Sequence, residues 1–199
     1  MKIVGFSDLH RDTRAAQIIV DCAHDADIVI RAGDFATHGQ GANDTLKVLR
    51  ALRCPFVIVH GNHDDPAALR SIAQDWTGAH YLHGDSVTLK GLTIFGMGGE
   101  TPIQNDAVWN VGQSEAEAQE LLTACPKDAI LVSHTPPLGH CDVQADGSHQ
   151  GSQALTTHIE TRNPSHVLCG HIHEAWGMKS TIGASKISNL GPNPTVFLI

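Results

Sequence analysis

The most informative stretch of this chain is Val167-Leu168-Cys169-Gly170-His171-Ile172-His173. Three apolar residues ending at a glycine predict a buried strand followed by a turn. Two histidines separated by one residue leave that turn, and both imidazoles can reach one point. Neutral imidazole is a common ligand of zinc, iron, nickel and related metals. A single His-x-His is also compatible with a polar turn facing water. Other residues of the chain are needed to distinguish a metal site from such a turn.

Four further apolar runs end at residues of the same chemical kind. These ends are Asp8-Leu9-His10, Gly33-Asp34, Gly61-Asn62-His63-Asp64 and Ser133-His134. The runs before the first three alternate with amphipathic segments, which predicts a parallel sheet with helical crossovers. In such sheets ligands bind beyond the carboxyl ends of the strands. The candidate ligands are therefore expected to lie at one edge of the sheet.

The expected elements change in character along the chain. The first part predicts strands at 2–7, 28–30 and 56–59 and helices at 13–24, 44–53 and 66–74, with Asp65-Pro66 opening the last helix. His80 and His83 are assigned to a turn. The second part predicts a hairpin at 87–95, a helix opened by the capping box Ser114/Glu117, a strand at 130–132 and a helix at 152–161. The tail, 179–182, 184–188 and 195–199, is expected to close a second sheet.

Composition restricts the function classes. The 199 residues are 41% hydrophobic and 17% charged and are expected to form a single domain, with a formal net charge of -8 that argues against non-specific nucleic-acid binding. Five dispersed cysteines without a Cys-x-x-Cys pair suit a reduced, cytoplasmic protein. No apolar run is long enough to cross a membrane, so no membrane partner is expected. The oligomeric state is left open.

The strand-end residues make up a mixed donor set of carboxylate, amide and imidazole groups. Such donors suit Mn, Fe, Zn, Ni or Co, and they are too many for one tetrahedral ion. They match two divalent transition-metal ions about 3.5–4 Å apart. The seven candidate ligands are Asp8, His10, Asp34, Asn62, His134, His171 and His173.

In this order, the five blocks resemble the calcineurin-like metallophosphoesterase family, in its small bacterial and archaeal subgroup. The resemblance spans residues 8–173 and implies a four-layer α/β/β/α sandwich over residues 1–199. It also implies that one metal is held by Asp8, His10 and His173, a second by Asn62, His134 and His171, with Asp34 bridging both. His63 would be catalytic rather than a ligand, with Asp64 orienting it.

The activity implied by this resemblance is hydrolysis of a small phosphoester by in-line attack of a bridging hydroxide. A phosphodiester is favoured, because a monoester dianion usually requires arginine or lysine near the metals. Arg11 and Arg31 are the only basic residues near the five blocks, and the orientation of Arg31 is open. A phosphomonoesterase or protein phosphatase is the alternative enzyme, and a non-catalytic protein-binding scaffold is the alternative outside enzymes.

Other histidines and tryptophans are assigned less specific roles. His38, His140 and His149 lie on loops that could reach the cleft. Trp76 and Trp109 are expected to be packing residues.

Overall fold

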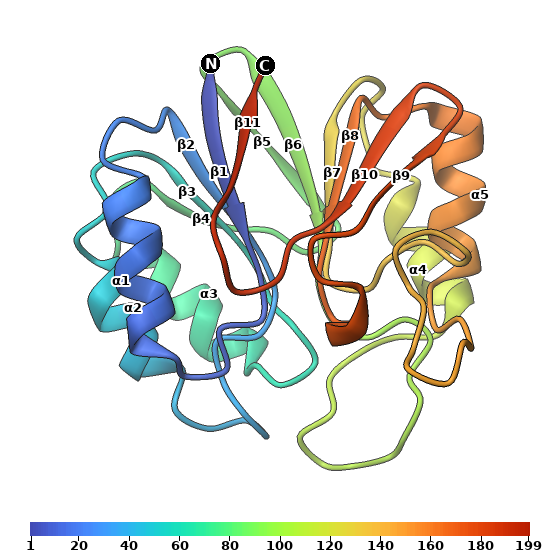
Figure 1. Cartoon of the computed structure of the whole chain (residues 1–199), viewed down its shortest axis with the longest axis horizontal. Helices are drawn as coiled ribbons and strands as arrows, with labels where there is room; N and C mark the ends of the chain where they lie inside the picture. Colours follow the sequence, from blue (N-terminus) through green and yellow to red (C-terminus); the bar gives the residue numbers. More distant parts are fainter.

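The computed structural model describes residues 1–199 as two β-sheets packed face to face, with helices on both outer faces (Figure 1). One sheet has the strand order β11-β1-β2-β3-β4 and the other β5-β6-β7-β8-β10-β9. The layers are therefore α/β/β/α, which confirms the fold class expected from the resemblance. None of the helices is both long enough and apolar enough to cross a bilayer.

The first sheet contains four parallel strands and one antiparallel edge strand. The parallel strands are β1 (Lys2–Phe6), β2 (Ile28–Ala32), β3 (Phe56–Val59) and β4 (Ala79–Tyr81), and β11 (Thr195–Leu198) pairs with β1 in the opposite direction. The connecting helices are α1 (Thr13–Cys22), α2 (Ala42–Leu49) and α3 (Pro66–Gln74). They all cover one face of this sheet, as Figure 1 shows.

The second sheet begins with an antiparallel hairpin and continues in parallel. Strands β5 (Asp85–Leu89) and β6 (Leu92–Met97) form the hairpin, and β7 (Ile130–Ser133), β8 (His166–Cys169) and β10 (Ser185–Asn189) then run parallel to β6. Strand β9 (Lys179–Ile182) pairs antiparallel with β10. The outer helices are α4 (Glu115–Leu122) and α5 (Gln153–Arg162), and a short 3₁₀ helix (His173–Ala175) follows β8.

Three apolar clusters correspond to the three interfaces of the sandwich. One lies between the first sheet and its helices, and another between the second sheet and α4 and α5. The third lies between the sheets, where Ile30 and Val57 share a cluster with Ile94 and Val132. Both faces of the central strands are therefore buried, which explains why these strands read as continuous apolar runs instead of alternating ones.

Helix starts follow the expected capping chemistry. Asp65 accepts hydrogen bonds from the N–H groups of Ala67 and Ala68 at the start of α3, with Pro66 in the first helical position. Ser114 and Glu117 form a reciprocal capping box at the start of α4. Both predictions are confirmed.

Two expectations for the strands are wrong. Strand β11 does not close the second sheet but extends the first, where Gly5 is opposite Thr195 and Ile3 opposite Phe197. His80, assigned to a turn, lies in strand β4. An isolated short strand carries no information about its partner, and in β4 a polar histidine interrupts the apolar pattern.

Candidate metal centre

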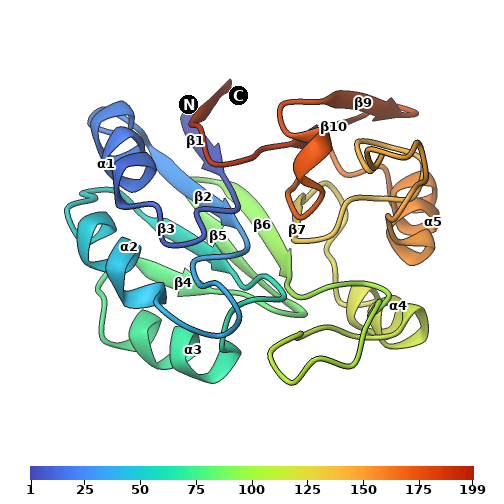
Figure 2. The same ribbon diagram turned by 60° about the horizontal axis from the view of Figure 1, so that its bottom comes forward.

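The predicted site residues come together where the carboxyl ends of the two sheets meet. The loops after β1, β2 and β3 lie at the same end of the molecule as those after β6, β7 and β8, at the bottom of Figure 1 and turned forward in Figure 2. Backbone hydrogen bonds tie these loops together. Asp8 N–H donates to the Gly33 carbonyl at 2.9 Å, and Gly170 N–H donates to the His134 carbonyl at 2.9 Å.

Backbone geometry at the strand ends is unusual for residues with side chains. Asp8, His10, Asp34 and His171 have φ values of 52°, 41°, 61° and 69°, in the left-handed region. Each such residue costs about 1–2 kcal/mol relative to ordinary backbone. Strain of this kind is common where a site demands particular side-chain directions. Here it affects four of the seven candidate ligands.

Glycines beside the ligands are required by close approach. A Cβ at Gly33 would lie 1.9 Å from His134 Nδ1, and one at Gly61 would lie 1.9 Å from Asp34 Oδ1. Neither distance leaves room for a carbon atom. The Gly-Asp and Gly-Asn segments are therefore explained by the packing of one ligand against the backbone that carries another.

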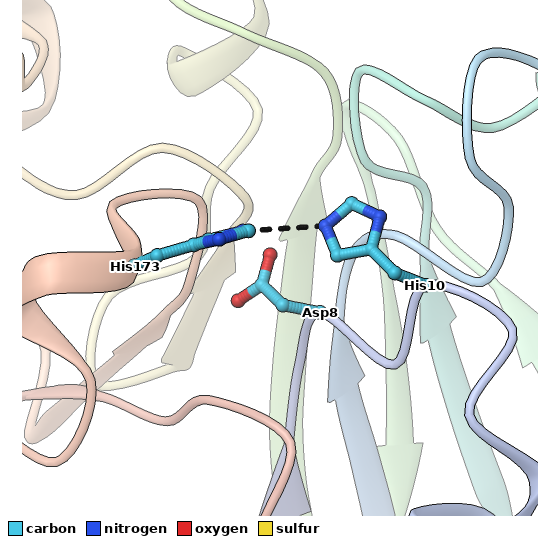
Figure 3. A group of neighbouring side chains, drawn as sticks. All are labelled: Asp8, His10 and His173. Carbon is cyan, nitrogen blue, oxygen red and sulfur yellow. Dashed lines mark hydrogen bonds between the residues drawn. The ribbon is translucent and has the colours of Figure 1, made fainter.

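One group of donors consists of Asp8, His10 and His173 (Figure 3). The Nε2 atoms of His10 and His173 are 3.2 Å apart, above the Asp8 carboxylate. His10 Nδ1 lies 3.0 Å from the Ala36 carbonyl, to which it donates, and this leaves His10 Nε2 with a free lone pair. The Asp8 carboxylate is fixed by Ser7 Oγ–H and by the Trp176 indole N–H, which is 3.1 Å away.

A second group consists of Asp8, Asp34 and His134. Asp34 Oδ2 lies 3.4 Å from His10 Nε2 and 3.5 Å from His134 Nε2, so that it faces both groups. His134 Nδ1 donates to the Ala32 carbonyl at 2.9 Å, and its Nε2 is 3.0 Å from Asn62 Oδ1. Six of the seven candidate ligands thus have a ligand atom that faces another member of the set.

The seventh candidate, His171, has a partner that the sequence analysis missed. Its ring centre is 4.9 Å from that of His134, and its Nε2 lies 3.3 Å from Glu100 Oε1. Glu100 also accepts from Asn110, whose own oxygen accepts from Asn62. The same rule that found the ligands could have found Glu100, because Gly98-Gly99-Glu100 follows the end of β6 at the same edge.

His63 lies beside these groups rather than among them. Its ring packs edge-on against His10, with centres 5.0 Å apart, and the His38 backbone N–H donates to its Nδ1 at 2.9 Å. This contact leaves the ring proton on Nε2. The Trp109 indole stacks on His63 with ring centres 4.4 Å apart and also packs on His38. Trp109 thus packs as expected, but against residues of the site, and Trp76 is buried in the core as expected.

Asp64 does not orient His63. Its Oδ1 accepts from the backbone N–H groups of Phe35 and Ala36, and its Oδ2 from those of Asp34 and Gly61 and from the guanidinium of Arg31. Asp64 instead anchors the loop that carries Asp34. Of the open loop histidines, His38 reaches the site, while His140 bonds to Ser180 and His149 to Asp142.

The electrostatics favour neutral imidazoles and an added positive charge. Burial is the main cause that lowers the pKa of His134 to about 3 and that of His63 to about 4. Burial, together with the nearby carboxylates of Asp64 and Asp8, raises the pKa of Asp34 well above its usual value. Burial alone would raise the pKa of Glu100, but hydrogen bonds from His171, Gln104 and Asn110 lower it to about 2.

The donor set fits divalent metal ions. Imidazole nitrogens, two buried carboxylates and an amide oxygen converge here, and no lysine or arginine makes a direct contact with these two carboxylates. These borderline-hard donors suit transition metals such as Mn, Fe, Zn, Ni and Co. A cation between them would offset the burial and the carboxylate repulsion that raise the pKa of Asp34.

Comparison with known proteins identifies the family. The sequence model of the calcineurin-like phosphoesterases matches residues 1–175. The chain belongs to this family. Calcineurin-like phosphoesterases are metal-dependent hydrolases of phosphoesters, which agrees with the candidate metal-binding groups.

Relatives of known sequence are distant. A UPF0046 protein of Caenorhabditis elegans is 28% identical over 228 residues, covering 100% of this chain and 75% of that protein. The cAMP/cGMP dual specificity phosphodiesterase of Mycobacterium tuberculosis is 28% identical over 156 residues, covering 74% of this chain and 48% of that protein. This chain therefore aligns with about half of the mycobacterial enzyme.

Solved structures confirm the fold. A protein of Thermus thermophilus superposes with a TM-score of 0.78 at 20% identity, covering 98% of this chain and 97% of that one. A dimetal phosphatase from Danio rerio gives a TM-score of 0.67 at 13% identity, covering 96% and 88% of the two chains. At these identities the likeness concerns the fold alone.

Proposed function

We propose that residues 1–199 form a single calcineurin-like phosphoesterase domain that hydrolyses phosphodiesters with two divalent transition-metal ions. Asp8, His10 and His173 would hold one ion, and the other would be held by Asn62, His134 and His171. Asp34 would bridge the two, a role supported by its Oδ2 atom, which faces histidines of both sets. When bound, the metal pair supplies an activated water and stabilises the charge that develops on the phosphoryl oxygens.

The role proposed for His63 is to stabilise the transition state at the leaving oxygen. Its Nδ1 accepts from the His38 N–H, so the ring N–H is on Nε2. The lowered pKa of about 4 keeps the ring neutral at pH 7, and a neutral ring can donate a hydrogen bond from Nε2 to the charge that develops on the leaving oxygen. Stacking on Trp109 restricts rotation of the ring.

The preference for phosphodiesters is supported by the position of Arg31, which is buried and paired away from the candidate metal centre. Its side chain is fully buried, its guanidinium lies over the Phe35 ring, and Nη1 is 3.4 Å from Asp64 Oδ2. Arg11, the other basic residue near the motifs, is exposed and pairs with Asp44. Both guanidinium groups near the motifs are therefore paired with carboxylates, and neither is free to meet the second charge of a monoester. A diester carries one negative charge and does not need one.

The names of two relatives agree with this substrate class. Besides the mycobacterial enzyme, a probable cyclic nucleotide phosphodiesterase of Synechococcus is 26% identical over 154 residues, covering 75% of this chain.

The five dispersed cysteines, none of them in a Cys-x-x-Cys pair, support a cytoplasmic location. A phosphomonoesterase acting through the same groups is the alternative, and a non-catalytic scaffold fits less well, because every candidate ligand is present.

The substrate class can be tested with two chromogenic esters. We expect kcat/KM to be higher for bis(p-nitrophenyl) phosphate than for p-nitrophenyl phosphate at the same metal concentration and pH. Arg11→Met, which changes the exposed arginine, is the control and should leave the ratio unchanged. A clear preference for the monoester would reverse the assignment and leave the metal centre in place.

A further inference from the structure

The loop between β6 and α4 places two polar residues against the candidate metal centre. Glu100 Oε1 lies 3.3 Å from His171 Nε2, and Asn110 Oδ1 accepts from Asn62 Nδ2 at 2.8 Å. Asn110 Nδ2 donates to Glu100 Oε2 at 2.7 Å, which joins the two contacts. The result is a continuous chain of polar contacts from His171 to Asn62.

The contact with Glu100 determines which nitrogen of His171 is free. In His10 and His134, Nδ1 donates to a backbone carbonyl, which leaves Nε2 for a metal. At His171 a carboxylate faces Nε2 instead, and a carboxylate in this position favours the tautomer with the proton on Nε2 and the lone pair on Nδ1. The His171 ring has no side-chain hydrogen bond to any other group, so Glu100 alone can determine this tautomer.

The contact with Asn110 acts similarly on the Asn62 amide. Because Asn62 Nδ2 donates to Asn110, the Asn62 Oδ1 faces His134 Nε2 at 3.0 Å. A flipped amide would present N–H donors to the metal position, and these cannot act as ligands.

The loop is held firmly enough to act in this way. Glu100 is 5% exposed, and its Oε2 also accepts from the Gln104 N–H at 3.0 Å. Backbone hydrogen bonds connect Glu100 N–H to the Val111 carbonyl and Val111 N–H to the Asn62 carbonyl, at 3.0 and 2.9 Å. The loop is therefore tied both to itself and to the segment that carries Asn62.

We propose that Glu100 and Asn110 are positioning residues that together pre-form one half of the centre: Glu100 selects Nδ1 of His171 as the ligand atom, and Asn110 orients the Asn62 oxygen. The inference rests on the two-metal centre of the proposed function. Partners of this kind usually change metal affinity by about 10–100-fold when they are removed. The effect should fall on only one of the two metal positions, because no contact links Glu100 or Asn110 to His10 or His173.

Two measurements test this directly. The first is the tautomer of His171 in the metal-free protein, read from ¹⁵N chemical shifts of the ring nitrogens. The second is the pair of stepwise Mn²⁺ binding constants from calorimetry. The variants are Glu100→Ala, Glu100→Gln, Asn110→Ala and the double alanine variant. Glu120→Gln, which removes an exposed carboxylate on α4, is the control.

We expect wild type to hold the proton on Nε2 of His171 and to bind two Mn²⁺ ions. Glu100→Ala should mix the tautomers and weaken one of the two ions by about tenfold or more, with the other within about threefold. Glu100→Gln, which keeps an acceptor oxygen, should recover part of the loss. Asn110→Ala should weaken the same ion, and the double variant should lose less than the product of the single effects because the residues are coupled.

Several results would overturn the inference. One is an unchanged His171 tautomer together with unchanged Mn²⁺ constants in Glu100→Ala. If Glu100→Ala weakens the binding of both Mn²⁺ ions equally, Glu100 acts only through its charge. If the variant has a lower melting temperature but normal metal binding, Glu100 contributes only to the stability of the fold. If wild type binds two ions and Glu100→Ala does so equally well, only this inference fails. A wild type that binds one ion overturns the two-metal proposal as well.

Discussion

The buried ion pair between Arg31 and Asp64 should control stability rather than substrate binding. Both side chains are fully inaccessible to solvent. Asp64 accepts four backbone hydrogen bonds in addition to its contact with Arg31, and two of the donors are Asp34 and Gly61. Arg31 is less well satisfied, since its Nε and Nη2 atoms have no hydrogen-bond partner, and burial lowers its pKa to about 10.

Asp64→Asn should be strongly destabilising. The amide would turn an N–H donor toward groups that are themselves donors, and the charge of Arg31 would remain buried without its partner. Breaking a buried pair in this way costs about 3–5 kcal/mol. At about 2–4 °C per kcal/mol for a domain of this size, the melting temperature should fall by about 6–20 °C.

The assay is a double-mutant cycle that combines Asp64→Asn with Arg31→Met, and the free energy of unfolding of each variant is measured by urea unfolding. Methionine can still pack on Phe35, and Asp64 keeps its four backbone donors, so this variant should cost about 1–3 kcal/mol. Asp64→Asn should then cost at least about 1 kcal/mol less in the Arg31→Met background than in wild type. The reasoning is refuted if Asp64→Asn costs the same in both backgrounds, or if it shifts stability by no more than a surface substitution, about 0.5 kcal/mol.

Three further predictions concern the site and the fold. Asp34→Asn should lower metal content at both positions in elemental analysis, whereas His63→Ala should keep normal metal content and lose about 10²–10⁴ in kcat; metal loss in His63→Ala would contradict its role. Gly33→Ala should destabilise by about 2–5 kcal/mol in urea unfolding, because its Cβ would collide with His134 at a φ of +99°, and an unchanged midpoint would contradict that packing. Burial and the nearby Arg162 lower the pKa of His158 below 6.5, so its protonation favours the unfolded state and stability falls as pH drops through 6.5. His158→Leu should show a smaller loss between pH 7.5 and 5.5, and parallel pH profiles would exclude this residue as a source.

The sequence was most informative where one residue's chemistry and its place on a strand coincide. His134 and His171 could be assigned to one cleft because parallel strands end at the same edge. The start of α3 could be predicted because Asp65-Pro66 specifies a helix start locally. The strand that pairs with β11 could not be predicted, because sheet pairing depends on the whole fold rather than on the four residues of the strand.

The missed site residues lie on a loop whose path the sequence does not specify. Glu100 and Asn110 are ten residues apart and meet only because the loop folds back on itself. Trp109 reaches His63 by the same path. Asp64 is adjacent to His63 in sequence, which suggests a contact between them, but its carboxylate binds the backbone N–H groups of residues 34–36 instead.

Two metal ions held by seven residues from both sheets are the basis of the proposed activity. The most direct measurement is the number of transition-metal ions per chain, determined by mass spectrometry on protein prepared without chelator and reconstituted with Mn²⁺. The arrangement of Asp34 between the two sets of histidines predicts close to two ions per chain, with phosphodiesterase activity lost on chelation and restored on re-addition. One ion per chain, or hydrolysis unaffected by exhaustive removal of metal, would contradict it.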